Sequence, residues 1–148
     1  MKVIFLDVDG VLNYDELFLH PDNADGLVLS PEILDRFCGI VKQTDAKVVL
    51  SSSWRHGTNS LGMITLELAS RGVVIYGTTP TTFGCHRGHE IQLWLESNNL
   101  VDRFAILDDD RNAEYAIDWL GHFFCTDFNI GLTEDISNQV INWLNWQK

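Results

Sequence analysis

The sequence predicts an α/β fold of three layers, in which helices cover both faces of a mainly parallel sheet of about five strands. Two observations support this prediction. Short apolar runs alternate along the chain with segments whose apolar residues recur at helical spacing, a pattern typical of parallel βαβ units. Polar or charged residues directly follow three of the four strong apolar runs, so a parallel sheet would collect them at one edge.

Size and composition indicate one domain over residues 1–148. The chain is 45% hydrophobic and has a mean hydropathy of -0.02, which is ordinary for a globular protein with a real core. Its three cysteines, Cys38, Cys85 and Cys125, are an odd number at wide spacing. We therefore expect reduced, partly buried thiols rather than a disulfide framework.

Charge and hydropathy narrow the classes of partner. The net charge of -11 and the pI near 4.6 argue against an extended nucleic-acid-binding surface, which needs a basic stripe, but they still allow a nucleic-acid end to bind locally. No apolar run approaches the roughly 18 residues of a membrane span. Only Lys2 and four apolar residues stand between Met1 and Asp7, too few for a signal-peptide core, so we expect a cytoplasmic protein by default.

The first predicted strand comprises residues 3–6, which are all apolar and suit a strand that is buried on both faces. Residues 13–29 are polar and rich in turn formers, which predicts a loop or small flap. Ser30 and Pro31 then form a favourable helix start, a capping hydroxyl followed by a proline at the first helical position. This helix should end near residues 43–45.

The second strand is predicted at residues 47–50, directly before the polar segment S-S-S-W-R. A helix over about residues 60–70, a third strand at 73–76 and a helix at 88–98 follow it.

The fourth strand is predicted at residues 104–107 and ends on three consecutive aspartates. A short helix at about 111–120 and a fifth strand at 122–125 follow. Thr133 caps a last helix that carries acidic residues in its first turn.

Two carboxylates, Asp7 and Asp9, follow the first strand and precede Gly10. Like charges at a sheet edge repel one another and lose hydration, so they need a cation, a raised pKa or both. Mg²⁺ suits such a position because it prefers hard oxygen ligands and takes few of them from the protein. Gly10 would let the chain turn sharply beside the bound group. The alternative is an ordinary acidic turn, since Asp and Gly are common turn residues.

Four segments, in this order, resemble the motifs of the haloacid-dehalogenase-like (HAD) phosphohydrolase superfamily. The segment D-V-D-G-V, which begins at Asp7, looks like the first motif, D-x-D-G-[TV], and Ser51 looks like the Ser or Thr of the second. Arg87 opens R-G-H-E-I-x-x-W-L, where the basic residue of the third motif belongs, and Asp108 and Asp109 after F-A-I-L look like the fourth. The resemblance runs from residue 2 to about residue 133 and implies a three-layer, Rossmann-like HAD fold.

The resemblance also implies a Mg²⁺-dependent phosphoric monoester hydrolase that works through an aspartyl-phosphate. Asp7 would be the nucleophile and a metal ligand. Asp9 would be the general acid and then the general base, and its backbone carbonyl would complete the metal shell. We expect Asp109 to be the direct fourth-motif ligand, with Asp108 holding the shell or Arg87, although the run of three acids leaves the choice between Asp108 and Asp109 open.

Hydroxyl, amide and basic groups would bind the phosphate. In the resemblance these are Ser51, the amide of Ser52, and Arg87, which stands where the superfamily more often has lysine, a point charge rather than a planar fork. Arg55 is either a second phosphate clamp or part of a structural ion pair. Trp54 either packs inside the protein, as the other tryptophans should, or it shapes the rim of the site or stacks on a substrate.

Within the superfamily, the S-S-S-W-R segment, the R-G-x-E-I helix and the later G-L-T are similar to a small branch that includes HAD domains of RNA-repair proteins. HAD enzymes that act on small metabolites usually carry a cap domain, and the gaps between the motifs leave no room for a sizeable one. We therefore expect an open site for a phosphorylated substrate, such as a nucleic-acid 3′ end or another large molecule. The alternatives are a small-molecule or nucleotide phosphatase and a non-catalytic HAD-fold binding module.

Overall fold

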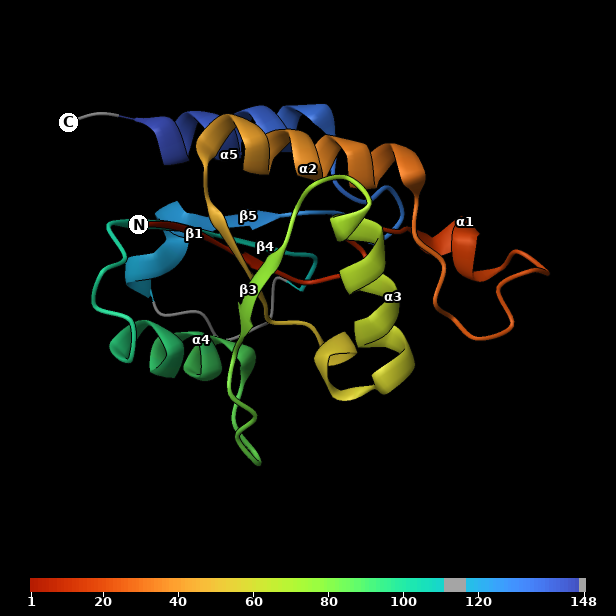
Figure 1. The fold of residues 1–148 in the computed structure, drawn as a ribbon, viewed down its shortest axis with the longest axis horizontal. Coiled ribbons are helices and arrows are strands. Elements are labelled where there is room, and N and C mark those ends of the chain that lie inside the picture. The colour runs from red at the N-terminus through yellow and green to blue at the C-terminus, as the bar shows by residue number, and fades with distance from the viewer. Residues whose placement is uncertain (111–116, 147–148) are drawn as a thin grey trace.

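The computed structural model describes residues 1–110 and 117–146, and it confirms the predicted α/β architecture. Five parallel strands form one sheet in the order β3-β2-β1-β4-β5, with helices on both faces (Figure 1). The strands are β1 (Lys2–Leu6), β2 (Lys47–Leu50), β3 (Ile75–Thr78), β4 (Arg103–Asp108) and β5 (Phe123–Cys125).

Strand β1 lies at the centre of the sheet and is buried on both faces, as its unbroken apolar run predicts. Successive side chains of a strand point to opposite faces. Ile4 and Leu6 accordingly belong to a core beneath α2 and α5, whereas Val3 and Phe5 belong to a smaller core beneath α4.

Helices α2 (Pro31–Thr44) and α5 (Glu134–Asn145) lie side by side on the first face (Figure 1). Both begin as the sequence predicts, because a side-chain hydroxyl caps each of them. Ser30 accepts a hydrogen bond of 3.3 Å from the amide of Ile33, and Thr133 accepts one of 3.3 Å from the amide of Ile136.

Helix α4 (Arg87–Glu96) covers the opposite face, where Trp94 meets Phe5 edge to face at 5.4 Å between ring centroids. A 3-10 turn, η1 (Ser53–His56), follows β2 and leads into α3 (Thr58–Ala69), which stands beside the sheet (Figure 1). This arrangement sends the segments that follow β1, β2 and β4 toward one edge, where the polar motifs lie.

The third strand begins two residues later than predicted, at Ile75 instead of residue 73. Val73 is still engaged in the turn that ends α3, because its amide donates to the carbonyl of Leu68 at 2.9 Å. Val74 is 78% exposed, and the pairing of β2 with β3 is irregular between Val48 and Val49. Since β3 is an edge strand, pairing on only one side defines where it starts.

The predicted loop of residues 13–29 contains a one-turn helix, α1 (Asp15–Phe18), and no folded unit that could cover the sheet edge. In the predicted helix at 111–120, residues 111–116 lie outside the described residues, and a 3-10 helix, η2, spans Ile117–His122. None of the three cysteines forms a disulfide: Cys38 is buried, Cys125 is half-buried and Cys85 is exposed. In the part of the chain that the structure describes, every helix is too short or too polar to cross a membrane.

Candidate active site

The register of the sheet brings three of the predicted motifs into one row. Leu6 of β1 pairs with Leu50 of β2 and with Leu107 of β4. The next residue on each strand therefore falls in line, which places Asp7 between Ser51 and Asp108. The backbone hydrogen bonds of the sheet continue through this row. The amide of Asp7 donates to the carbonyl of Leu107 at 3.0 Å, and the amide of Ser51 donates to the carbonyl of Leu6 at 2.9 Å. These residues share the face of the sheet that α4 covers.

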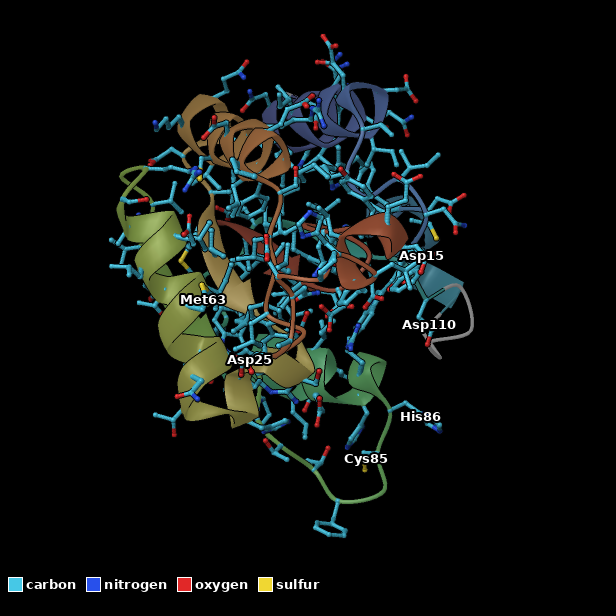
Figure 2. All side chains as sticks on the ribbon, turned by 90° about the vertical axis from the view of Figure 1, so that its right-hand side faces the viewer. Asp15, Asp25, Met63, Cys85, His86 and Asp110 are labelled. Atoms are coloured by element: carbon cyan, nitrogen blue, oxygen red, sulfur yellow. The ribbon has the colours of Figure 1, made fainter. Side chains whose placement is uncertain are left out.

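Figure 2 looks onto this edge, with the carboxyl ends of the strands toward the viewer. Asp15 and Asp25, in the segment that follows β1, and Cys85 and His86, in the loop before α4, border it from different sides. Within residues 1–110 and 117–146, the sheet edge thus has loops around it but no cap domain over it.

Three carboxylates converge at this edge. One oxygen each from Asp7, Asp108 and Asp109 lies within 4.8 Å of the other two. Asp7 is only 5% exposed, Asp108 is fully buried and Asp109 is half-buried. A compact set of hard oxygen donors with partial access to solvent fits a divalent cation such as Mg²⁺. Asp9 is outside this group.

The pKa values of two of these carboxyls reflect the crowding. Burial raises the pKa of Asp7 from 3.8 to about 6; the positive charge of Arg87 and a hydrogen bond with the Ser52 side chain act in the opposite direction, and the charge of Asp108 adds to the rise. Burial, and next the charge of Asp108, also raise the pKa of Asp109. The charged cluster is therefore unfavourable by itself and gains from a cation.

Arg87 supplies one positive charge to the cluster. It is the first residue of α4, and its Nη1 lies 2.9 Å from Oδ2 of Asp7 and also contacts Oδ2 of Asp108. The predicted third-motif residue thus bridges carboxylates of the first and fourth motifs. A guanidinium stays protonated in proteins, so this charge is permanent.

Gly10 allows Asp109 to approach the turn after β1. Its φ of +73° is in the left-handed region, and a Cβ at this position would lie 2.5 Å from Cγ of Asp109. The sharp turn predicted at Gly10 is confirmed, and it lets the side chain of Asp109 pack directly against the backbone of this turn.

The two serines at the end of β2 have different surroundings, although both are fully buried. The Ser52 side chain hydrogen-bonds to Asp7, and its Oγ also accepts from the amide of Trp54 at 3.3 Å. The Ser51 hydroxyl has no hydrogen-bond partner among the described residues. A buried hydroxyl with no protein partner is suited to donate to an oxygen of a bound group.

Arg55 takes part in a buried ion pair, one of the two predicted alternatives. Its Nη2 lies 2.6 Å from Oε2 of Glu90, and the two side chains are 6% and 8% exposed. Its Nη1 donates to the backbone carbonyls of Ser51 and Ser52 at 2.9 and 2.7 Å. Arg55 therefore fastens η1 and the end of β2 to α4, while its phosphate-clamp role stays a prediction.

Asp9 is held apart from the cluster by two neutral donors. Asn13 Nδ2 donates to its Oδ1 at 2.9 Å, and Trp54 Nε1 donates to its Oδ2 at 3.0 Å. Asn13 is fully buried and Trp54 is 4% exposed. The indole therefore packs inside the protein, and the alternative in which its ring stacks on a substrate is wrong.

With this geometry in view, comparison with protein families matches residues 3–136 to the HAD domain in Swiss Army Knife RNA repair proteins. The chain belongs to this family. Searches of curated proteins and of solved structures found no match. The family match covers most of the chain and all four motifs, and it confirms the resemblance drawn from them.

Sequence analysis missed three residues that shape this HAD site: Asn13, Glu90 and Thr79. Asn13 and Glu90 orient the predicted residues Asp9 and Arg55. Thr79 follows β3 in the same row as Ser51, and its hydroxyl also lacks a partner among the described residues. For Asn13 the sequence holds one local signal, because it lies only four residues after Asp9 and so within reach of that carboxylate.

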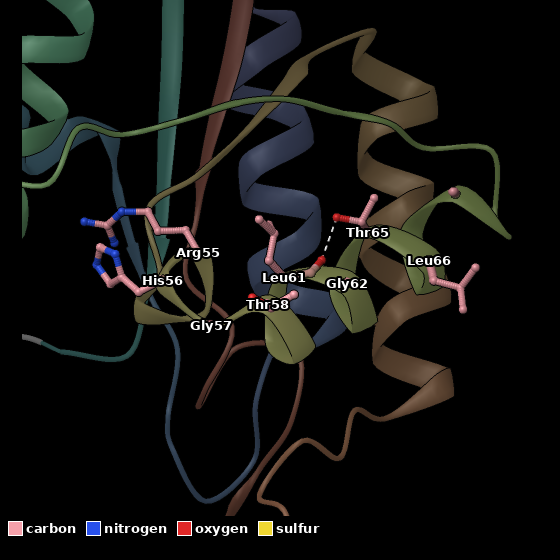
Figure 3. A pocket seen from close by; sticks show the side chains of 9 residues that line it. Arg55, His56, Gly57, Thr58, Leu61, Gly62, Thr65 and Leu66 are labelled. Carbon is pink, nitrogen blue, oxygen red and sulfur yellow. Dashed lines mark hydrogen bonds between the residues drawn. The ribbon is translucent and has the colours of Figure 1, made fainter.

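A groove of about 610 Å³ lies outside the HAD site, between η1 and α3 (Figure 3). Arg55 and His56 stand at one end of it, and Leu61, Thr65 and Leu66 line it along α3. None of the clustered carboxylates lines this groove, so its apolar wall on α3 is not part of the candidate active site.

We expect Gly10→Ala to destabilise the protein more than Gly26→Ala, because only the first adds a steric conflict to the backbone strain. Gly26 has a similar φ of +67°, but a Cβ there would meet nothing within 4 Å. Alanine in the left-handed region costs about 1 kcal/mol, and the contact with Asp109 should add on the order of 1–2 kcal/mol. Urea unfolding of both variants measures the difference, and equal losses would contradict this account of Gly10.

The raised pKa of Asp7 predicts a pH-dependent stability when a chelator is present. The folded state holds the proton of Asp7 more tightly than the unfolded chain does, so the free energy of unfolding should fall as the pH rises from about 4 to about 6. The contribution of this group is at most about 3 kcal/mol. Denaturant titrations over this range should show a shallower fall for Asp7→Asn than for wild type. Asp135→Asn, on the exposed side of α5, is the control and should keep the wild-type slope.

Proposed function

We propose that this HAD domain is a divalent-metal-dependent phosphatase that hydrolyses a phosphate monoester through an aspartyl-phosphate. The observation that carries the proposal is the cluster of Asp7, Asp108 and Asp109 with Arg87 lying against it. A carboxylate that attacks a phosphate ester is an anion approaching an anion, so it needs charge neutralisation and positioning. The cluster offers both.

Asp7, Asp108 and Asp109 would hold the metal ion, Mg²⁺ in our proposal, and the backbone carbonyl of Asp9 would complete its shell. The bound ion would neutralise charge on the phosphoryl oxygens. Asp109, half-buried and packed on the turn at Gly10, is the more accessible fourth-motif acid. Asp108 is fully buried and contacts Arg87, so it is suited to keep the Arg87 guanidinium in place beside the metal.

In the first step, a carboxylate oxygen of Asp7 attacks phosphorus and the bond from phosphorus to the leaving oxygen breaks. Asp9 donates a proton to that oxygen, so the alcohol leaves neutral. In the second step, Asp9 takes a proton from water, which attacks phosphorus, and the bond to Asp7 breaks to release phosphate. Ser51, the amide of Ser52, and Arg87 would bind the phosphoryl oxygens.

For the substrate we propose a phosphorylated nucleic-acid end. The family is named for RNA repair proteins, and the described part of the chain places no cap over the sheet edge that would enclose a small molecule. The net charge of -11 opposes a long nucleic-acid contact, but it is compatible with local capture of a terminal phosphate.

The enzyme assignment predicts that hydrolysis of 4-nitrophenyl phosphate requires a divalent metal and Asp7. EDTA should abolish turnover and Mg²⁺ should restore it. Asp7→Asn should lower kcat about 1,000-fold or more, because it removes the nucleophile. Asp135→Asn is the control and should retain wild-type kcat. Full activity in Asp7→Asn would overturn the mechanism, and a wild-type protein that binds Mg²⁺ yet hydrolyses no phosphate ester would indicate a binding module.

The substrate assignment predicts a preference for oligonucleotides over mononucleotides. Each should be offered as a 3′-phosphate with matched terminal bases, with released phosphate as the readout. We expect kcat/KM to be about 10-fold or more higher for the oligonucleotide, because neighbouring nucleotides add binding energy outside the phosphate site. Equal or higher kcat/KM for the mononucleotide would favour a small-molecule phosphatase instead.

A further inference from the structure

The carboxylate of Asp9 receives its two hydrogen bonds from separate parts of the chain. Asn13, in the turn after β1, donates to Oδ1, and Trp54, in η1 after β2, donates to Oδ2. Forty-five residues separate Asp9 from Trp54. A donor on each oxygen defines both the position of the carboxylate and the rotation of its plane.

Both donors are themselves fixed. The side chain of Asn13 also accepts from the amide of Gly10 at 2.8 Å and donates to the carbonyl of Val28 at 3.1 Å. The backbone of Trp54 donates to Ser52 Oγ at 3.3 Å, and its carbonyl accepts from Ser60 Oγ at 2.8 Å. The side chain of Asn13 cannot turn away without breaking these hydrogen bonds, and the indole of Trp54 is packed on an anchored backbone at 4% exposure. The orientation of Asp9 is therefore set before any substrate binds.

We infer that Trp54 and Asn13 are positioning residues that aim Asp9 at the leaving oxygen and keep its carboxylate out of the metal cluster. This inference rests on the proposed phosphatase function. Asp9 lies only two residues from Asp7, and a carboxylate that rotated toward the cluster would become a further metal ligand and lose its role as acid and base. The two N–H donors, one on each oxygen, oppose this rotation.

The arrangement leaves room for the proton that Asp9 must carry. Each carboxylate oxygen has two lone pairs, and one hydrogen bond occupies only one of them. The remaining lone pairs can hold the proton for the leaving oxygen, and later the proton taken from water. Neither Asn13 nor Trp54 has to move or exchange a proton during the reaction.

The test compares Trp54→Phe with wild type on two esters, 4-nitrophenyl phosphate and an alkyl phosphate. The variant keeps an aromatic ring in the buried position and loses the N–H donor. A nitrophenolate leaves without a proton, whereas an alkoxide needs one, so misplacing the acid should affect the two esters unequally. We expect kcat/KM to fall about 10- to 100-fold for the alkyl ester and less than about 3-fold for the aryl ester. The parameter kcat/KM is used because it reports on formation of the aspartyl-phosphate alone.

Trp143→Phe is the matched control, because it also removes an indole hydrogen bond, of 2.8 Å to the carbonyl of Phe104, but does so under α5. It should leave the ratio of the two kcat/KM values unchanged. Asn13→Asp is the second variant: it keeps an acceptor for Gly10 and replaces the N–H donor to Asp9 Oδ1 with an oxygen, which cannot hold that carboxylate in place. The ratio should therefore shift in the same direction as in Trp54→Phe. If Trp54→Phe fails to fold, as judged by thermal unfolding, Asn13→Asp decides.

The possible outcomes separate this inference from the proposed function. A wild-type protein inactive on both esters would remove the phosphatase assignment itself. A wild-type protein active on both, with Trp54→Phe and Asn13→Asp lowering the two kcat/KM values by the same factor, would leave the phosphatase intact and overturn the positioning role. A selective loss on the alkyl ester in either variant would support it.

Discussion

The site depends on one constraint, the register that sets Asp7 of β1 beside Asp108 of β4. Both side chains are buried, and two like charges about 4 Å apart repel by roughly 4 kcal/mol at an effective dielectric constant of 20. The fold cannot relieve this repulsion by moving one strand, because the backbone ladder continues through Asp7. The relief has to come from positive charge, and among the described residues Arg87 supplies it by contacting both carboxylates.

The first turn of α4 connects this charge balance to the rest of the fold. Arg87 reaches the carboxylates at the end of β1 and β4, and Glu90, three residues later on the same helix face, pairs with Arg55 of η1. One helix end thus fastens the segments that follow β1, β2 and β4. Arg87 sets one positive charge against the three clustered carboxylates, so the sheet edge stays negative and needs a cation before it can accept an anion.

The fold and the carboxylate cluster could be predicted because each depends on local patterns. Apolar runs of four residues mark strands, and acids directly after parallel strands share an edge. Asp7 and Asp108 then come together because β1 and β4 are neighbours in the sheet. The start of β3 was predicted wrongly because it depends on edge pairing rather than on the apolar run that includes Val74. The partner of Arg55 could not be predicted, since the same guanidinium suits a phosphate or a carboxylate until Glu90 is seen beside it.

The hydrogen bonds to Asp9 are the clearest example of contacts that sequence patterns cannot predict. A tryptophan after a strand predicts burial, but nothing in its spacing indicates that the indole N–H will meet a carboxylate 45 residues earlier. That contact exists because β1 and β2 are neighbours in the sheet, so the segments that follow them are neighbours too. The described residues place no cap over the edge, and the groups that orient Asp9 come from the turns of the domain itself. The turn after β1 and η1 after β2 are the segments close enough to supply them, and their donors Asn13 and Trp54 are buried where solvent cannot compete.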